Sequence, residues 1–379
     1  MNDSESKLSR RNVLRAAAAA IPAAAVRGAA ANSAVTVGLL GSGSRGTFVA
    51  GLLGKNAPAR VVALCDLFDE KIERARKSIG LEDPKVYKDF HQMLASDIDA
   101  VIIATPVFLH PEHFEAAVKA GKHIYIEKPA AVDVEGCKRI MRVADSASRK
   151  LNITFGFQRR YAQVYQKAKQ LADSGAIGPI RMGHAHFIKS GGAWAGVQQL
   201  PRPQTEREKI VAWHGWKDLS GDLIVENNVH SIDVLNWFLG GHPRSAIGSG
   251  GATLPKRGDM RDHNFVAYEY DKGVQGQLAG STLAPGNYRH VTEQFFGESG
   301  MVETSENYWR HFRNREQDTT EKSPRNITID AVAEFVNRIA EGRPENVGAR
   351  GAESTLTAIL GRMAMDARRE VTWEEMMKS

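Results

Sequence analysis

The segment "GSGSRG", residues 41–46, constrains the fold of this chain more than any other feature of its sequence. It follows the apolar run Val35–Gly41, opens the helical pattern Arg45–Lys55, and has the spacing G-x-G-x-x-G. In such a turn the first glycine permits the tight bend, the second lets the backbone approach a pyrophosphate, and the third lets the helix pack closely on the strand. The helix N-terminus offers free N–H groups to the phosphates. A glycine turn without a ligand is the alternative. We therefore expect a dinucleotide-binding loop formed by Gly41, Ser42, Gly43, Ser44, Arg45 and Gly46.

Asp66 indicates which dinucleotide the loop prefers. It ends the second apolar run, Val61–Asp66, and stands 20 residues after Gly46. A carboxylate at this place accepts hydrogen bonds from ribose hydroxyls and repels a 2′-phosphate, which favours NAD over NADP. Arg45 leaves NADP open, because a nearby guanidinium pairs well with a phosphate.

Apolar runs and helical patterns alternate through the first part of the chain, which predicts a parallel sheet with helices on both faces. After Gln158 the pattern changes to runs of alternating polarity, which predicts a mostly antiparallel sheet. The expected strands of that sheet are Ile180–Ile188, Ser245–Gly251, Asn264–Tyr270, Val274–Leu283, His290–Gly297 and Gly300–Thr304.

The expected fold class is therefore α/β, with an N-terminal dinucleotide-binding domain and a C-terminal α+β domain that carries a large open sheet. We place the first domain at residues 34–157 and the second at residues 158–327. The helices expected within residues 328–379 would pack back on the core.

The N-terminal segment, residues 1–31, resembles a twin-arginine signal peptide. Arg10 and Arg11 precede the weakly apolar stretch Ala16–Val26, and small residues at Ala29–Ala31 suit signal peptidase. An alanine-rich helix with two chance arginines is the alternative. The resemblance implies a periplasmic or exported protein that crosses the membrane already folded.

Charge and hydropathy exclude two classes of partner. Residues 1–31 contribute +3 of the net charge of +6, and the other basic residues do not gather with interleaved aromatics. We therefore expect no nucleic-acid partner. No apolar run after the N-terminus is long enough to cross a bilayer, so we expect no membrane insertion once the signal is removed.

Two further segments carry candidate chemistry. In "HIYIEKPAA" Lys128 follows a strand, at the edge where parallel sheets bind ligands, and its ammonium can stabilise a developing alkoxide. In "VENNVHSIDVLNWFLGG" a regular helix would bring Glu226, His230 and Asp233 within about 60° of one another. His230 is then a natural general base for a hydroxyl proton, with Glu226 orienting its ring. A surface lysine and a solvated helix face are the alternatives.

Histidines and tryptophans elsewhere support weaker hypotheses. His184 and His186 share one strand face, but no third ligand or HExxH pattern accompanies them, so we expect no metal. Trp213 lies in a segment interrupted by glycine and proline. Its indole would either stack on a sugar ring or simply pack.

These motifs together resemble the Gfo/Idh/MocA oxidoreductases, over nearly all of the chain after the signal. The resemblance rests on the glycine turn and on "ATPVFLHPEHFEAAVKAGKHIYIEKPAA", "GFQRRYAQVYQKAKQLADSGAIGPI" and "SGDLIVENNVHSIDVLNWFLGGHP". It implies a catalytic group of Lys128, Glu226 and His230, and a second domain whose open sheet is buried in a homo-oligomer, a dimer or tetramer. Two residues depart from the family pattern: Glu226 replaces the usual aspartate, and Asn228 replaces a glycine.

The same segments give the remaining predicted contacts. Cofactor contacts are expected, besides the glycine loop and Asp66, at Thr105, Pro106, His110, Glu127 and Lys128. Substrate contacts are expected at Lys128, Arg159, His186, Trp213, Asp233 and His230.

The expected activity is hydride transfer between a secondary hydroxyl of a sugar or polyol and a nicotinamide cofactor, NAD with NADP possible. A redox-neutral glycoside hydrolase or epimerase that passes through a keto-sugar is the first alternative, and a non-catalytic sugar- or nucleotide-binding protein is the second. An export signal joined to a dinucleotide loop raises a conflict, because no NAD pool is maintained outside the cytoplasm. We therefore expect the cofactor to stay bound between turnovers.

Overall fold

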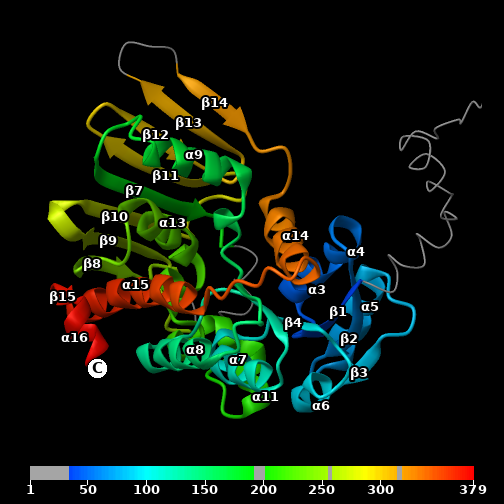
Figure 1. Cartoon of the computed structure of the whole chain (residues 1–379). Helices are drawn as coiled ribbons and strands as arrows, with labels where there is room; N and C mark the ends of the chain where they lie inside the picture. The colour runs from blue at the N-terminus through cyan, green and yellow to red at the C-terminus, as the bar shows by residue number, and fades with distance from the viewer. Residues whose placement is uncertain (1–33, 192–200, 255–257, 314–317) are drawn as a thin grey trace, which may run out of the picture. The chain divides into compact units, whose positions relative to one another are not determined.

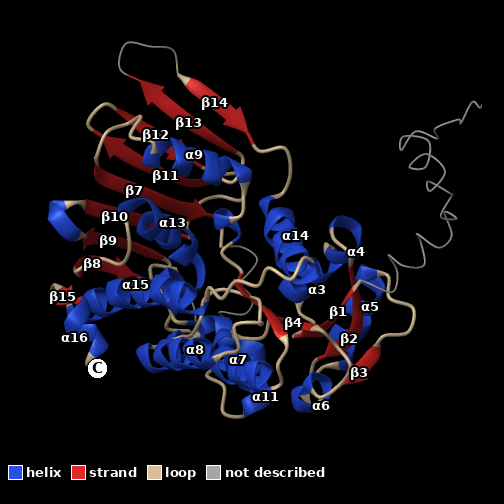
Figure 2. Ribbon diagram, in the orientation of Figure 1, coloured by secondary structure: helices blue, strands red, loops and turns tan. Residues whose placement is uncertain are grey.

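Six parallel strands form the first sheet of the protein, in the order β3-β2-β1-β4-β5-β6 (Figures 1 and 2). This computed structural model describes residues 34–191, 201–254, 258–313 and 318–379. The strands are β1 (Val35–Leu40), β2 (Ala59–Cys65), β3 (Lys85–Tyr87), β4 (Ala100–Ile103), β5 (His123–Ile126) and β6 (Ile153–Phe155). All four residues of β4 are buried, as expected for a strand covered on both faces.

Helices follow the strands of this sheet and cover it. They are α3 (Ser44–Gly51), α4 (Leu53–Asn56), α5 (Asp69–Ile79), α6 (Phe90–Leu94), the 3-10 turn η1 (Val107–Leu109), α7 (His110–Lys119) and α8 (Val134–Ser146). The strand order reverses direction between β1 and β4, and the carboxyl ends of such strands form the crevice in which open α/β sheets bind ligands.

The second sheet has nine strands in the order β14-β13-β12-β11-β7-β10-β9-β8-β15. Only the pairing of β10 with β7 is parallel. The strands are β7 (Ile180–Lys189), β8 (Ser245–Gly251), β9 (His263–Glu269), β10 (Gln275–Ser281), β11 (Arg289–Gly297), β12 (Gly300–Thr304), β13 (Tyr308–Arg313), β14 (Thr319–Lys322) and β15 (Val371–Thr372). The predicted fold class is confirmed.

Helices and short turns lie around this second sheet. They are η2 (Gln158–Arg160), α9 (Gln163–Asp173), α11 (Glu206–Ala212), η4 (Trp213–Gly215), α12 (Lys217–Ser220), the π-helical turn η5 (Ile224–Asn228), α13 (Val229–Leu239) and η6 (Asp271–Gly273). Phe238 of α13 stacks on Phe295 of β11 with ring centroids 4.0 Å apart. One face of the sheet therefore packs on helices, whereas Ile247 and Phe265 on the other face are 53% and 55% exposed.

The C-terminal helices contact the elements of both sheets. They are α14 (Ile327–Ala340), α15 (Gly348–Ala367) and α16 (Trp373–Met377). Phe335 of α14 packs edge-on against Tyr125 of β5, at a centroid distance of 5.7 Å. Thr355 of α15 accepts a hydrogen bond from the backbone of Ala130, at 3.0 Å.

Several short elements were absent from the prediction. They are β3, β13, β14, β15, α6, α11, α12 and η5. Cys65 and Cys137 are buried free thiols. Among the described residues, no helix is both long and apolar enough to span a bilayer. The predicted signal, residues 1–31, lies outside the described residues.

Candidate functional site

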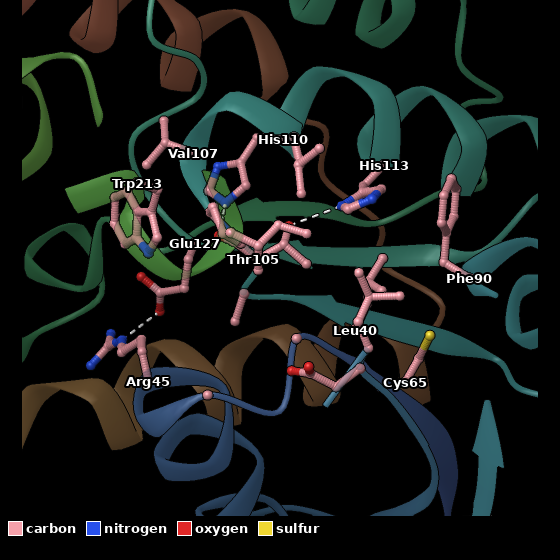
Figure 3. Close-up of a pocket in the computed structure, with 18 of the residues that line it drawn as sticks. Leu40, Arg45, Cys65, Phe90, Thr105, Val107, His110, His113, Glu127 and Trp213 are labelled. Carbon is pink, nitrogen blue, oxygen red and sulfur yellow. Dashed lines mark hydrogen bonds and ion pairs between the residues drawn. The ribbon is translucent and has the colours of Figure 1, made fainter. Parts of the chain in front are cut away.

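A cavity of about 830 Å³ opens at the carboxyl ends of β1, β2, β4 and β5 and is closed on its other side by residues of the second domain (Figure 3). Most predicted site residues line it. They are Gly41, Gly43, Ser44, Arg45, Asp66, Thr105, Pro106, His110, Glu127, Lys128, Trp213, Glu226 and His230. Residues separated by up to 190 positions in the sequence thus meet in one space.

The glycine loop leaves room for a ligand. A Cβ added at Gly43 would meet no atom within 4 Å, so its backbone faces open cavity. A Cβ at Gly46 would lie 2.1 Å from the carbonyl oxygen of Gly41, so this glycine is needed for the helix to approach the strand. Gly41 itself has φ of +93°, which favours glycine. Ser42 does not line the cavity, and its Oγ is buried without a hydrogen-bond partner among the described residues. The loop fits the pyrophosphate of a dinucleotide.

Asp66 is held at the end of β2 by two backbone N–H groups. The N–H of Ser42 donates to Oδ2 at 2.9 Å, and that of Phe68 donates to Oδ1 at 3.0 Å. Each carboxylate oxygen retains accepting capacity toward the cavity. The side chain is therefore fixed where ribose hydroxyls would donate to it.

Arg45 pairs with Glu127 (Figure 3). Its Nε donates to Oε1 of Glu127 at 2.8 Å, while Oε2 of this nearly buried carboxylate has no hydrogen-bond partner among the described residues. Because the guanidinium is engaged by Glu127, it is not placed to pair with a 2′-phosphate beside Asp66.

His110 joins the two loops that follow β4 and β5. Its Nδ1 lies 2.7 Å from the carbonyl oxygen of Pro129, and its Nε2 lies 2.9 Å from that of Thr105. Burial lowers the pKa of the imidazole although both carbonyls favour its protonation. Thr105 is also 2.9 Å from Nδ1 of His113 through its hydroxyl. These contacts fix the cavity wall next to Lys128.

At the far end of the cavity Glu226 is surrounded by donors. Lys128 donates from Nζ to the backbone carbonyl of Glu226 at 2.6 Å and to Oε1 at 3.2 Å. His214 places Nε2 3.3 Å from Oε2, and the Asn227 amide also donates to this oxygen. Burial raises the pKa of Glu226, but the charge of Lys128 and the contact with His214 outweigh it and hold the pKa below its usual range. The carboxylate is therefore ionised and fixes Lys128.

The prediction that Glu226 orients His230 is wrong in this structure. The segment Ile224–Asn228 is a π-helical turn, so the two residues are not related by the regular helical spacing that the prediction assumed. Nδ1 of His230 is buried and has no hydrogen-bond partner among the described residues. Its ring instead lies between Phe157 and Phe187, at centroid distances of 6.3 and 6.5 Å.

His230 is nevertheless suited to accept a proton. Burial, followed by the positive charges of Lys128 and Arg159, lowers the pKa of the imidazole well below its usual range. The ring is therefore neutral at neutral pH, and it lines the cavity beside Lys128. A neutral imidazole and an ammonium thus face the same space.

Three predicted substrate contacts lie outside the cavity lining. Asp233 is 1% exposed and accepts from Arg160, at 2.9 and 2.8 Å, and from Ser354, at 2.7 Å. Arg159 is likewise buried: its Nη1 donates to Glu293 at 2.6 Å and to Ser231 at 2.9 Å. Both charges are satisfied inside the protein, so neither side chain is free to hold a substrate.

His186 lies on the wrong face of β7 for a substrate contact. Phe187 faces His230, and because side chains alternate along a strand, His186 points to the opposite face of the sheet. There it stacks on His290 at a centroid distance of 4.7 Å. Lys189, two residues beyond Phe187, shares the helix-covered face, and its ammonium lies 5.1 Å from the Phe187 ring.

Sequence reasoning missed three polar residues of this site. His214 and Gln158 line the cavity, and the Oε1 atom of Gln158 is buried without a partner among the described residues. Burial lowers the pKa of Lys189 to about 8. The charge of Glu226 opposes this shift, and the charge of Lys128 adds to it. Gln158 precedes the predicted Arg159 in "GFQRRY", and His214 follows the predicted Trp213. Both missed residues are therefore sequence neighbours of residues that were predicted.

Comparisons with known proteins agree with this geometry. Residues 35–155 match the model of the oxidoreductase family with an NAD-binding Rossmann fold, and residues 165–303 match the C-terminal domain of the GFO/IDH/MocA family. Inositol 2-dehydrogenase of Klebsiella pneumoniae is 30% identical over 222 residues, 57% of this chain and 58% of that enzyme. This chain thus matches little more than half the length of that relative. Myo-inositol 2-dehydrogenase of Thermotoga maritima is 22% identical over 364 residues, 90% of this chain and 99% of that enzyme.

Solved structures share the fold. The structure of apo scyllo-inositol dehydrogenase from Lactobacillus casei superposes with a TM-score of 0.71 at 23% identity, over 89% of this chain and 98% of that one. A levoglucosan dehydrogenase in complex with NADH and levoglucosan superposes with a TM-score of 0.75 at 21% identity, over 89% of this chain and 99% of that one. The first domain of this chain is thus an NAD-binding Rossmann domain.

Proposed function

Because this chain belongs to the Gfo/Idh/MocA oxidoreductase family, we propose that it transfers a hydride between a secondary hydroxyl of a sugar or polyol and NAD. One observation carries the proposal: Lys128 and the neutral imidazole of His230 face the same end of a cavity whose other end is the glycine loop. The related enzymes named for inositol and levoglucosan support a cyclic polyhydroxy substrate.

Each side chain has a distinct task in this reaction. Lys128 donates a hydrogen bond to the reacting hydroxyl and stabilises the alkoxide as it forms. His230 accepts the hydroxyl proton. Glu226 keeps the Lys128 ammonium at the cavity, through the contact of 3.2 Å, rather than orienting His230. NAD, when bound along Gly43 and Asp66, supplies the hydride acceptor.

The experiment has two measurements on the purified protein. Mass spectrometry after denaturation is expected to find NAD bound, and incubation with a panel of inositols, aldoses and anhydrosugars is expected to raise absorbance of the reduced cofactor with at least one of them. If NAD is present and no member of the panel is oxidised, while a glycoside is cleaved, the redox-neutral function below replaces this one.

A redox-neutral hydrolase or epimerase is the second candidate, and His214 favours it. Simple hydride transfer needs one base, which His230 supplies, yet a second imidazole stands 3.3 Å from Glu226 in the same cavity. After oxidation of one carbon, such a base removes a proton from the neighbouring carbon. In a hydrolase the leaving group then departs with a proton, and water adds to the double bond that this leaves; in an epimerase the proton returns to the other face. The hydride then returns to the oxidised carbon. Deuterium from D2O would enter the sugar carbon, and no reduced cofactor would accumulate.

We propose that the protein acts outside the cytoplasm, exported by the twin-arginine route, and that its cofactor stays bound between turnovers. The pattern Arg10-Arg11 followed by a weakly apolar stretch supports export, and the dinucleotide loop that follows it supports loading before export. Extended dialysis of the mature protein against buffer without nucleotide is the test. Bound nicotinamide should remain near one per chain, and loss within minutes would contradict retention.

We also propose that the chain forms a homo-oligomer, a dimer or tetramer, through the open face of its nine-stranded sheet. The exposed apolar side chains Ile247 and Phe265 on that face support this, because exposed apolar surface on a sheet marks an interaction site.

A further inference from the structure

The segment 206–214, called here the bridging segment, runs along the cavity from the second domain. It consists of α11 and the first two residues of η4. Its cavity-lining residues are Glu206, Ile210, Val211, Trp213 and His214. Positions 206, 210 and 213–214 recur at helical spacing, so one continuous face of the segment looks into the cavity.

The segment begins at the adenosine end of the cavity. The Arg207 guanidinium lies 4.2 Å from the ring centroid of Phe68, a contact of cation–π geometry. Phe68 donates its backbone N–H to Asp66, the residue placed for the ribose. The Lys71 ammonium lies 4.3 Å from the same ring. The first turn of α11 is therefore attached next to the ribose position.

The segment ends at the catalytic end of the cavity. His214 contacts the Glu226 carboxylate at 3.3 Å, and that carboxylate in turn holds Lys128. The bridging segment thus contacts the first domain beside Asp66 and the catalytic group beside Glu226. The glycine loop and the bridging segment line the same cavity.

Apolar side chains from both domains also line this cavity. Val211 of α11 and Leu67 of the first domain both line the cavity, although they are 46% and 45% exposed. Ile210 lines it next to Val211. Apolar side chains left exposed on two sides of one cavity favour a flat ring between them, and Asp66 identifies the ring as the adenine of the nucleotide.

We infer that the bridging segment binds the adenosine half of NAD between α11 and Leu67 and thereby slows its release. This inference rests on the proposed function for the presence of NAD, but it assigns binding residues that the glycine motif does not contain. For the dinucleotide to leave, the Arg207–Phe68 contact must break and α11 must move. The bridging segment therefore affects the rate at which NAD dissociates rather than the rate of the chemical step.

The test uses the wild-type holoprotein and the variants Arg207→Ala and Val211→Ala. Bound NAD is displaced by excess 1,N6-etheno-NAD, and the exchange is followed by fluorescence, which requires no turnover. We expect both variants to release NAD at least about tenfold faster than the wild type. Val211 is half exposed, so its truncation leaves the fold intact.

Arg202→Ala is the matched control. Arg202 precedes α11 and pairs with Asp218 on the surface, at 2.9 and 2.6 Å, and does not line the cavity. It should exchange NAD at the wild-type rate. Exchange rates for Arg207→Ala and Val211→Ala equal to that of Arg202→Ala would overturn the inference. A wild type that binds NAD but oxidises no sugar would instead contradict the proposed function and leave the exchange result standing.

Discussion

Lys128 and His230 line the same cavity although they are 102 positions apart in the sequence, and each should be necessary for turnover. Removal of a general base costs about 10²–10⁴ in rate. We expect His230→Ala and Lys128→Ala each to lose at least the lower end of this range in kcat while retaining bound NAD. Steady-state kinetics with a quantified NAD content checks this, and near-normal turnover of either variant removes that residue from the mechanism.

The lowered pKa of His230 predicts an unusual pH profile. Oxidation needs the neutral imidazole, which prevails above the pKa, and burial together with the Lys128 and Arg159 charges moves that pKa down. An ordinary histidine would lose its basic form below about pH 6.5. We therefore expect kcat for sugar oxidation to stay level as the pH falls from about 7.5 to about 6. A profile that falls by half near pH 6.5 would show that His230 titrates normally.

Asp66 should set the preference for NAD. Its carboxylate is fixed by Ser42 and Phe68, and Arg45 is engaged by Glu127, so a 2′-phosphate would meet a negative charge without a guanidinium to offset it. The ratio of kcat/KM for NAD to that for NADP should be well above one, and Asp66→Ser should lower it at least about tenfold. Equal use of both cofactors by the wild type would assign the selection to Arg45 instead.

The sequence predicted a site residue correctly where the position of its backbone is enough to bring it to the cavity. It failed where the direction of the side chain decides whether the residue reaches the cavity. Gly43, Asp66 and Lys128 lie at strand ends, so the order of the strands was enough to bring them together. Arg159 and His186 were each one residue from a side chain that does reach the site, Gln158 and Phe187. On the strand β7 a displacement by one residue reverses the face of the side chain, and on the 3-10 turn η2 it turns the side chain in another direction.

At the scale of elements, the sequence predicted the strands and helices that contain long apolar runs, but it did not predict the short elements. The strands β13 and β14 lie at the edge of the second sheet, and β14, with the sequence TTEK, buries no apolar side chain. The helix α11 did carry a signal, because Thr205 and Glu208 form a capping box in which each side chain accepts from the other's backbone. The π-helical turn before α13 has no such signature, and it misled the assignment of Glu226.

At the scale of elements, we predict that a charge on the open face of the nine-stranded sheet disrupts the proposed oligomer. A charge at Phe265, which is 55% exposed, would have to be desolvated in an oligomer but not in a monomer. Phe265→Asp should therefore shift the protein toward monomers in light scattering after gel filtration. Phe48→Asp is the control, because Phe48 is also exposed, at 41%, but lies on α3 of the first domain and not on the second sheet. An assembly that is unchanged by Phe265→Asp would place the contact elsewhere.

For the whole molecule, the prediction concerns where it works. The signal resemblance requires the arginine pair, so Arg10→Lys and Arg11→Lys together should stop the appearance of a shortened protein in the periplasm. Immunoblots of cell fractions, with activity assayed in each, check this. The double variant should accumulate in the cytoplasm as a folded, NAD-bound protein. Normal export of this variant would mean that residues 1–31 act in another way.

Strand β7 affects two properties of the molecule, because one of its faces lies toward His230 and the other belongs to the open face of the sheet. Phe187 and Lys189 stand on the same side of the sheet as His230, whereas His186 stands with His290 on the open face. Only one layer of backbone separates them. Over evolutionary time, substitutions at Phe187 and Lys189 would change the surroundings of His230, and substitutions at His186 would change the open face through which we propose that copies of the chain assemble. The two properties can drift independently by substitution, but a single inserted or deleted residue in β7 would exchange the two faces and disturb both at once.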